Sequence, residues 1–369
     1  MERVNKWFGG AFKSSNLPRV ARYEPDNTLA TGRQLKIWPP VYAPSWYYYQ
    51  MHQANHWYTN EHNPLDDKEG FEKIDRCWQN ALLQSFAALA IGDDHVMSMI
   101  NKSALKWEES TEWLFTDQGA RETTHKIVYN RMLELAHSSA CFTVNTLTND
   151  AFVNYLMDCK PINSFTVPDR NETMDKALFL ATMILCERYL FAAPFLIINL
   201  MSESGLINTC VKINMQVMKD EHVHYLHAVQ LWHDLQTPEH ASAVDAMFVD
   251  LASLFKRLVE QMVLKICVDL PENQKLGVMD HTRFTLRTIF VDCGVSGIPE
   301  DVVDYTTTPF LVFDKNTGVD KFNLMESNST VYKASKTIYI PDWSGLYASV
   351  QNEQEEEREL KRKRVMLKQ

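Results

Sequence analysis

The stretch ETTHKIVYN, from Glu122 to Asn130, places a carboxylate, an imidazole and a phenol at helical spacing. At about 100° per residue, the side chains of Glu122, His125 and Tyr129 fall within about 60° of one another around a helix. All three therefore project from the same face. A carboxylate and an imidazole on one helix face are metal ligands, and the pattern predicts part of a metal site with a tyrosine beside it.

A second Glu-x-x-His pair, Glu221 and His224, lies in the stretch MKDEHVHYLH. In carboxylate-bridged two-metal proteins, two helices of a bundle each supply such a pair, and two others each supply one further carboxylate. Two lone acids on apolar segments fit that need. Glu187 lies in the most apolar segment of the chain, and SFAALAIGDDHVMSMI carries Asp93 and Asp94.

The types of these ligands indicate which metals they would bind. Four carboxylates and two imidazoles suit iron or manganese, and the absence of cysteine from the set argues against a structural zinc site. A single Glu-x-x-His pair arises by chance on many helices, and we interpret Glu134 and His137 as such a pair. Two copies with two well-placed acids favour a dinuclear site over a polar network in the core.

The segments that must position these residues read as helices. Between about 70 and 295 the chain is rich in Leu, Met, Ala and Phe and poor in Gly and Pro. The predicted helices span 71–104, 118–147, 149–158, 172–201, 206–235, 239–268 and 274–290. Pro194 lacks an amide donor, so we expect a kink or bulge just past Glu187.

These patterns predict an all-α protein in three parts. The prolines of residues 1–45 indicate an extended N-terminal arm, residues 46–300 a helical di-metal domain, and residues 301–369 an irregular, partly mobile C-terminal extension. No linker separates the motifs, so one large core is expected.

Composition and charge bear on partners and location. The net charge of −10 provides no general basic patch, so we expect no nucleic acid partner. Seven cysteines without a CxxC pair, and no signal peptide, indicate reduced thiols in the cytoplasm. The apolar stretch 178–201 could span a membrane by length, but Glu187 and Arg188 near its middle favour a buried helix and no membrane partner.

The order of these motifs resembles the small, radical-generating subunit of class I ribonucleotide reductase, a ferritin-like family. The resemblance covers about residues 47–290. The family order is Asp, Glu-x-x-His followed by Tyr, Glu, and Asp-Glu-x-x-His, and the matching residues are Asp94, Glu122, His125, Tyr129, Glu187, Asp220, Glu221 and His224. Phe191 and Phe195 match two phenylalanines that enclose the radical, and Trp57 matches an upstream tryptophan. Trp57 lies 37 residues before Asp94, which favours Asp94 over Asp93 as the ligand.

The resemblance implies a ferritin-like bundle that forms a homodimer and holds two iron ions, with manganese or a mixed pair as alternatives. Tyr129 would form a radical for a large subunit that reduces ribonucleotides. Trp57 and Asp220 would form a relay with His125, and Asp220 would fix the tautomer of His125. Tyr347 in the tail would continue the transfer, with Tyr339 as the second choice.

Two other functions fit the same helices. A di-iron oxygenase or desaturase would need an open substrate pocket beside the metals, and the tyrosine after His125 speaks against it. A metal-storage or structural bundle would give no role to Trp57, Asp220 and a tail tyrosine. The basic C-terminal sequence KRKRVMLKQ departs from the acidic or apolar docking peptide that the family resemblance implies.

Overall fold

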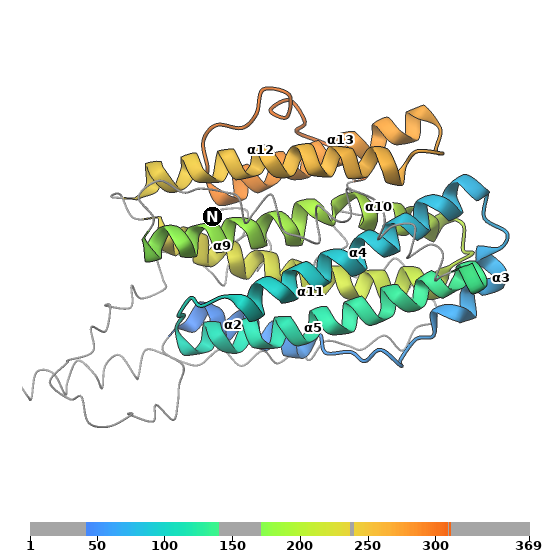
Figure 1. Ribbon diagram of the computed structural model, residues 1–369, viewed down its shortest axis with the longest axis horizontal. Coiled ribbons are helices and arrows are strands. Elements are labelled where there is room, and N and C mark those ends of the chain that lie inside the picture. Colours follow the sequence, from blue (N-terminus) through green and yellow to red (C-terminus); the bar gives the residue numbers. More distant parts are fainter. Residues whose placement is uncertain (1–41, 140–170, 237–239, 309, 311–369) are drawn as a thin grey trace, which may run out of the picture.

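Long helices make up most of the part of the chain that the structure describes. The structure is a computed structural model, and the described residues are 42–139, 171–236, 240–308 and 310 (Figure 1). The principal elements are α2 (Ala43–Ala54), α4 (Arg76–Lys102), α5 (Glu109–Leu133), α9 (Glu172–Ile184), the π-helical segment η4 (Leu185–Leu190), α10 (Ala192–Leu200), α11 (Asn208–Leu235), α12 (Ala241–Ile266) and α13 (Glu272–Cys293). No β-strand occurs among these described residues, and the predicted all-α fold is confirmed.

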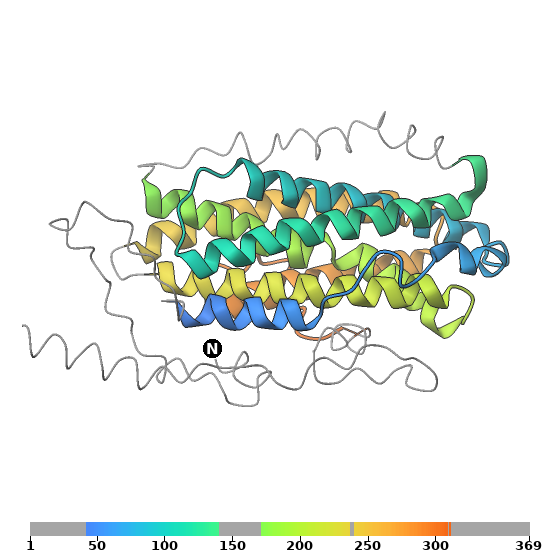
Figure 2. The same cartoon turned by 90° about the horizontal axis from the view of Figure 1, so that it is seen from below.

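The long helices run side by side along one axis and form a bundle (Figures 1 and 2). The α4–α5 pair has the most extensive helix–helix contact, and α2 packs on α5 and α11. On the other side of the bundle, α12 packs against α13, while α10 lies between α13 and α4. In the interior, α4 and α11 each contact both α5 and η4, so these four elements meet there.

Local capping explains where several helices begin and end. The side chain of Asn171 accepts a hydrogen bond from the backbone N–H of Met174 (2.9 Å), which caps α9. The Glu108 carboxylate accepts one from the backbone N–H of Ser110, so α5 begins nine residues before the predicted start at 118. The last long helix, α13, ends at Cys293 and is followed by Gly294, whose φ of +67° suits glycine.

The N-terminal limit of the helical body differs from the prediction. Residues 43–45 were assigned to an extended arm on the basis of their prolines, but α2 already begins at Ala43. Pro44 lies in the first turn of α2, where proline is tolerated because that amide has no helical acceptor. Residues 1–41, residues 140–170 and almost all of the C-terminal extension lie outside the described residues, and so does the predicted helix 149–158.

The helix that carries Glu187 is interrupted, as Pro194 predicts. Residues Leu185–Leu190 form a wider π-helical turn between α9 and α10. The predicted bulge is confirmed, although it contains Glu187 instead of lying just past it. Such a turn is frequent at functional sites because it changes the direction of a side chain without ending the helix.

The same apolar helix is the only described stretch long and apolar enough to span a membrane. This stretch, Glu172–Glu203, has a mean hydropathy of 1.6, and 94% of its most apolar window is buried inside the protein. Its apolar surface is thus already covered by the bundle, which agrees with the prediction of a buried helix.

A buried histidine makes the bundle sensitive to acid. His227 has no exposed surface, its Nε2 lies 2.7 Å from Ser45 Oγ, and burial lowers its pKa to about 3. Between pH 6.5 and about 3, the imidazole of His227 binds a proton in the unfolded chain but not in the folded one. The free energy of unfolding should therefore decrease as the pH is lowered through this range. We expect His227→Gln to reduce this fall, by up to about 1.4 kcal/mol per pH unit. Urea unfolding of the metal-free protein at several pH values measures it.

The exposed His56 supplies the control for this prediction, because His56→Gln removes a histidine that is not buried. Its pH dependence of unfolding should match that of the wild type. Equal slopes for the wild type and His227→Gln would contradict the prediction.

Candidate metal centre

Six side chains from four elements converge in the interior of the bundle. They form two overlapping groups, and in each group the ligand atoms all lie within 4.8 Å of one another. One group is Asp93, Glu122, His125 and Glu221; the other is Glu122, Glu187, Glu221 and His224. Glu122 and Glu221 belong to both groups, and all six residues are buried. Two adjacent metal positions that share two carboxylates fit this arrangement.

The two shared glutamates each reach both histidines. Glu221 places Oε1 2.8 Å from Nδ1 of His125 and Oε2 3.0 Å from Nδ1 of His224. Glu122 does the same with its Oε2 and Oε1, at 3.2 Å from each Nδ1. Each carboxylate therefore spans the interior between the two imidazoles. This follows from the sequence locally, because Glu and His three residues apart share a helix face on α5 and on α11.

The four buried carboxylates of the cluster are suited to bind cations, which would balance their negative charge. Burial raises the pKa of Glu187, and the neighbouring Glu221 raises it further. Although burial opposes it, Glu221 and Asp220 raise the pKa of His125. Neither carboxylate oxygen of Asp93 has a hydrogen-bond partner. The donor set of buried oxygens and two imidazoles thus fits two hard divalent ions.

The cluster contains Asp93 and not Asp94, the residue that the sequence analysis had favoured as the first ligand. Asp93 is fully buried and belongs to the cluster, whereas Asp94 is part-exposed and forms an ion pair with Lys126 of α5. Adjacent residues differ by about 100° around a helix, so only one of them can face the centre. The spacing from Trp57 could not determine this, because most of residues 55–75 lie outside the long helices and do not fix the rotation of α4.

Paired substitutions test this assignment. We expect Asp93→Asn to weaken metal binding by at least about 10-fold. Loss of a side chain that only hydrogen-bonds to a metal ligand already weakens metal affinity by about that much. Asp94→Asn should bind metal as the wild type does, because it only removes an ion pair at the edge of the bundle. Titration with Mn²⁺, with the free ion followed by electron paramagnetic resonance, measures both; equal losses would contradict the assignment.

Tyr129 lies in a closed environment beside this cluster. It has no exposed surface, and its hydroxyl donates a hydrogen bond to Asn214 Oδ1 (3.0 Å). Burial raises the pKa of Tyr129, with Asp93 as the next cause, so the phenol keeps its proton at neutral pH. The amide of Asn214 in turn lies 3.4 Å from the backbone oxygen of Phe195. The phenol is therefore linked to the helix that carries the two phenylalanines.

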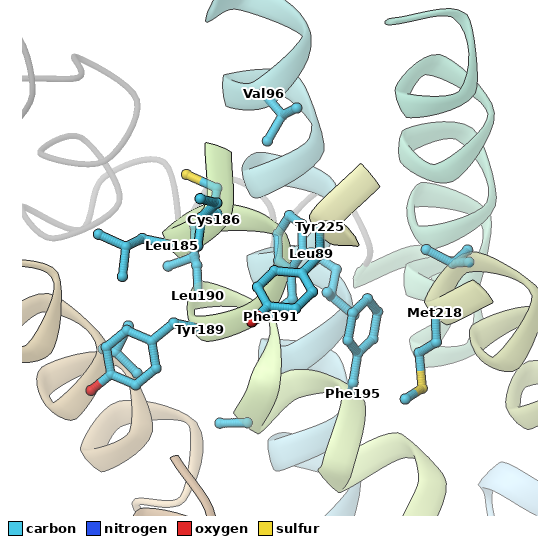
Figure 3. Packing of buried hydrophobic residues seen from close by; sticks show 14 of the residues in the cluster. Leu89, Val96, Leu185, Cys186, Tyr189, Leu190, Phe191, Phe195, Met218 and Tyr225 are labelled. Carbon is cyan, nitrogen blue, oxygen red and sulfur yellow. The ribbon is translucent and has the colours of Figure 1, made fainter. Parts of the chain in front are cut away.

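The two phenylalanines are buried next to each other. The rings of Phe191 and Phe195 meet edge to face with their centroids 5.6 Å apart (Figure 3). Gly92 allows α4 to come close to Phe191, since a Cβ at position 92 would lie 2.2 Å from the ring of Phe191. Glycine at position 92, one residue before Asp93, thus lets α4 pack directly on Phe191.

Trp57, Asp220 and His125 are also brought together. Trp57 Nε1 donates to Asp220 Oδ2 (2.8 Å), and the same oxygen lies 3.2 Å from His125 Nε2. The indole and imidazole rings are nearly parallel, with centroids 6.0 Å apart. Arg121 Nε lies 3.7 Å from Asp220, and hydrogen bonding and charge keep the pKa of this buried carboxyl low despite desolvation. This hydrogen-bonded path leads from the cluster to Trp57, whose side chain is 3% exposed.

Four residues around the cluster were not predicted from the sequence. Gln118 Nε2 donates to Glu187 Oε1 (2.6 Å), Asn214 binds Tyr129, and His52 with Asp117 lies behind His224. A signal existed for two of them: Gln118 is four residues before Glu122 and Asn214 seven before Glu221, so each shares the helix face of its glutamate. Nothing in the sequence indicated His52 or Asp117.

The remaining residues named in the sequence predictions are Glu134, Tyr347 and Tyr339. Glu134 is exposed, which agrees with its interpretation as a chance match. Tyr347 and Tyr339 lie outside the described residues.

Comparison with known proteins places this geometry in a family. A family model described as "Ribonucleotide reductase, small chain" matches residues 34–295. No curated protein matches the chain. Among solved structures, the ribonucleotide reductase R2 subunit from Clostridium botulinum is 15% identical with a TM-score of 0.63, covering 75% of this chain and 88% of that one. The dimanganese(II) NrdF of Streptococcus sanguinis is 12% identical with a TM-score of 0.57, covering 74% of this chain and 94% of that one. The fold is thus that of these ferritin-like bundles, and the chain belongs to the ribonucleotide reductase small chain family.

Proposed function

We propose that this chain is the radical-generating subunit of a class I ribonucleotide reductase. The side chains of the cluster would hold two metal ions, Tyr129 would carry a tyrosyl radical, and a large subunit would use that radical to reduce ribonucleotides to deoxyribonucleotides. One observation carries the proposal: two glutamates each span the same two histidines, and a fully buried tyrosine lies on the same helix face as one of these Glu-x-x-His pairs.

The ligand roles follow from the two overlapping groups. Glu122 and Glu221 would be shared by the two metal positions, Asp93 and His125 would complete the first position, and Glu187 and His224 would complete the second. The ions are two irons, with manganese or a mixed pair as alternatives, since these ligand types bind either metal. When bound, the metals supply the oxidising equivalent that reaction with oxygen provides.

Tyr129 is the proposed radical residue. Its burial excludes water, and its raised pKa means that oxidation must remove a proton together with an electron. The hydroxyl is held by Asn214, which fixes the direction of the O–H bond. Phe191 and Phe195 cover this side of the interior with side chains that have no groups able to donate or accept protons.

Trp57, Asp220 and His125 form the proposed path between the centre and the partner subunit. The Asp220 carboxylate accepts from both rings, so it holds His125 in the tautomer that leaves Nδ1 for the metal. Tyr347 of the C-terminal extension, with Tyr339 as the second choice, is proposed as the next residue on the way to the large subunit.

The volume beside the cluster argues against an oxygenase or desaturase. A cavity lined by Glu187, Phe195, Glu221 and neighbouring residues has a volume of about 30 Å³. That space is small for an organic substrate. A storage bundle would leave the hydrogen-bonded path through Trp57 without a role.

The family also implies the partner, a large reductase subunit. We propose in addition that the chain forms a homodimer and acts in the cytoplasm. The five described cysteines, Cys77, Cys186, Cys210, Cys267 and Cys293, are free thiols, which suits a reducing compartment. The division into an arm (1–45), a di-metal domain (46–300) and a docking extension (301–369) is kept as a proposal, with the helical part beginning at Ala43.

Reconstitution with a large subunit tests the function. After addition of iron(II) and oxygen, the wild type should show a tyrosyl radical and support ribonucleotide reduction. Trp57→Phe should retain the radical but lose at least about 100-fold in reduction, about 2.7 kcal/mol in barrier, because it removes the indole N–H that binds Asp220. Radical yield and product formation, measured on the same sample, separate these steps.

Trp113→Phe is the matched control, since Trp113 lies partly buried on α5 and its described ring contacts are with Trp46 and Tyr49. It should retain both radical and reduction. If Trp57→Phe reduces ribonucleotides as well as Trp113→Phe does, the path does not pass through Trp57.

A further inference from the structure

A second hydrogen-bonded chain runs behind the cluster, on the side of His224. His52 of α2 has no exposed surface, and its Nε2 lies 2.9 Å from Nε2 of His224. The other ring nitrogen of His52, Nδ1, lies 2.6 Å from Asp117 Oδ2, and Gln53 Nε2 donates to the same oxygen (2.8 Å). Asp117 is part-exposed at 22%, so the chain reaches the surface of the bundle.

The positions of the protons in this chain follow from valence. Nδ1 of His224 faces Glu122 and Glu221, so a metal ion would bind that nitrogen and leave the proton on Nε2. Nε2 of His224 then donates to Nε2 of His52, which must be the acceptor. A neutral imidazole that accepts at Nε2 carries its proton on Nδ1, and Asp117 accepts that proton's hydrogen bond. With a metal ion on Nδ1 of His224, each ring nitrogen would have one partner, and the tautomers of both histidines would be fixed.

The helix that carries His52 is itself held in place. Arg121 of α5 donates to the backbone oxygens of His52 (3.3 Å) and Trp57 (3.2 Å). Because Asp117 and Arg121 both belong to α5, one helix fixes both the backbone and the side chain of His52. The ring of His52 meets the ring of His224 at 4.7 Å between centroids and an angle of 63°. The geometry is that of a rigid support and not of a chance surface contact.

We propose that His52, held by Asp117, is the positioning residue of the second metal position, the one formed by Glu122, Glu187, Glu221 and His224. It fixes the tautomer and the ring orientation of His224 and thereby sets the metal affinity of that position. The proposal rests on the proposed ligand role of His224.

The supports of the two histidine ligands differ in charge. His125 has the Asp220 carboxylate behind it, whereas His224 has a neutral imidazole. A carboxylate is the stronger hydrogen-bond acceptor and makes the imidazole a better metal ligand. Each position otherwise has three carboxylates and one histidine. The first position therefore binds its ion more tightly, and the second depends on His52.

Titration of the metal-free, full-length chain with Mn²⁺ alone tests the proposal, with the free ion followed by electron paramagnetic resonance. The wild type should bind two equivalents in two steps. In His52→Ala the second equivalent should bind about 10- to 100-fold more weakly, and the first should change by less than about twofold. His52→Gln should restore the second step, because its amide oxygen accepts from His224 and its N–H donates to Asp117.

Three further variants complete the design. His56→Ala removes an exposed histidine two residues beyond the end of the same helix and should titrate as the wild type does. Asp117→Ala removes the support of His52 from a part-exposed position, so it is the substitute if His52→Ala does not fold, and it should weaken the second equivalent severalfold. His224→Ala should lose the second equivalent.

The results that would overturn the proposal are distinct from those that would overturn the ligand assignment. If His224→Ala loses the second equivalent while His52→Ala and Asp117→Ala bind it normally, His52 is not the positioning residue. Equal weakening of both equivalents in His52→Ala would also overturn the proposal, since the effect would not be specific to one position. If His224→Ala still binds two equivalents, His224 is not a ligand, and both the assignment and this inference fail.

Discussion

Tyr129→Phe is expected to abolish the tyrosyl radical while leaving the metal centre intact. The substitution removes one oxygen atom, and the phenyl ring that remains has no hydroxyl proton to release on oxidation. None of the six clustered side chains is altered, so two metal ions should still bind. Electron paramagnetic resonance after addition of iron(II) and oxygen, with metal content measured on the same sample, tests this. Ribonucleotide reduction with the large subunit should fall to background.

Tyr189→Phe provides the control for this experiment. Tyr189 is as deeply buried as Tyr129 and lies in η4, two residues from Glu187, so it experiences a similar interior. It should keep the radical signal. A tyrosyl signal that persists in Tyr129→Phe would place the radical on another residue.

A general loss of stability does not account for the expected effect. Tyr129→Phe leaves Asn214 Oδ1 without its donor, which costs about 1–3 kcal/mol for a buried acceptor. The amide N–H of Asn214 keeps its hydrogen bond to Asn199 (2.8 Å), so the side chain stays in place. The bundle should therefore remain folded, and thermal unfolding can verify this independently of the radical.

The sequence predicted most helices because their signals are local. The predicted helix 206–235 is observed as α11, Asn208–Leu235, and the interruption near Glu187 followed from the missing amide of Pro194. The start of α5 was missed because Glu108 caps the helix through its carboxylate, which is a less common cap than Ser, Thr, Asp or Asn. The start of α2 was missed because prolines allow either an extended chain or a helix beginning.

The two Glu-x-x-His pairs could be predicted because the residues of each pair share a helix, and Glu187 because it is a lone acid in an apolar segment. Glu and His three residues apart face the same way wherever the helix packs, so both pairs and Tyr129 were identified. The choice between Asp93 and Asp94 depends on how α4 is rotated against α5 and α10, and packing alone determines that rotation. The contact between His52 and His224 joins residues 172 positions apart, and nothing in either helix alone indicates it.

Glu221→Ala is expected to weaken both metal positions together. Its two carboxylate oxygens lie 2.8 Å and 3.0 Å from the Nδ1 atoms of His125 and His224, so one side chain serves both positions. Removing it leaves each position with two carboxylates and one imidazole. Each Mn²⁺ equivalent should then bind at least about 10-fold more weakly, and no radical should form. The Mn²⁺ titration described above measures both steps.

Glu187→Ala is the matched control, because Glu187 belongs to the second group alone. It should weaken only one Mn²⁺ equivalent, although it removes the same type of buried carboxylate from the same cluster. The contrast therefore separates a bridging ligand from a terminal one, which total metal content cannot do. If Glu221→Ala loses a single equivalent, as Glu187→Ala should, then Glu221 does not bridge. The two positions would then be linked through Glu122 alone, whose oxygens also span both histidines.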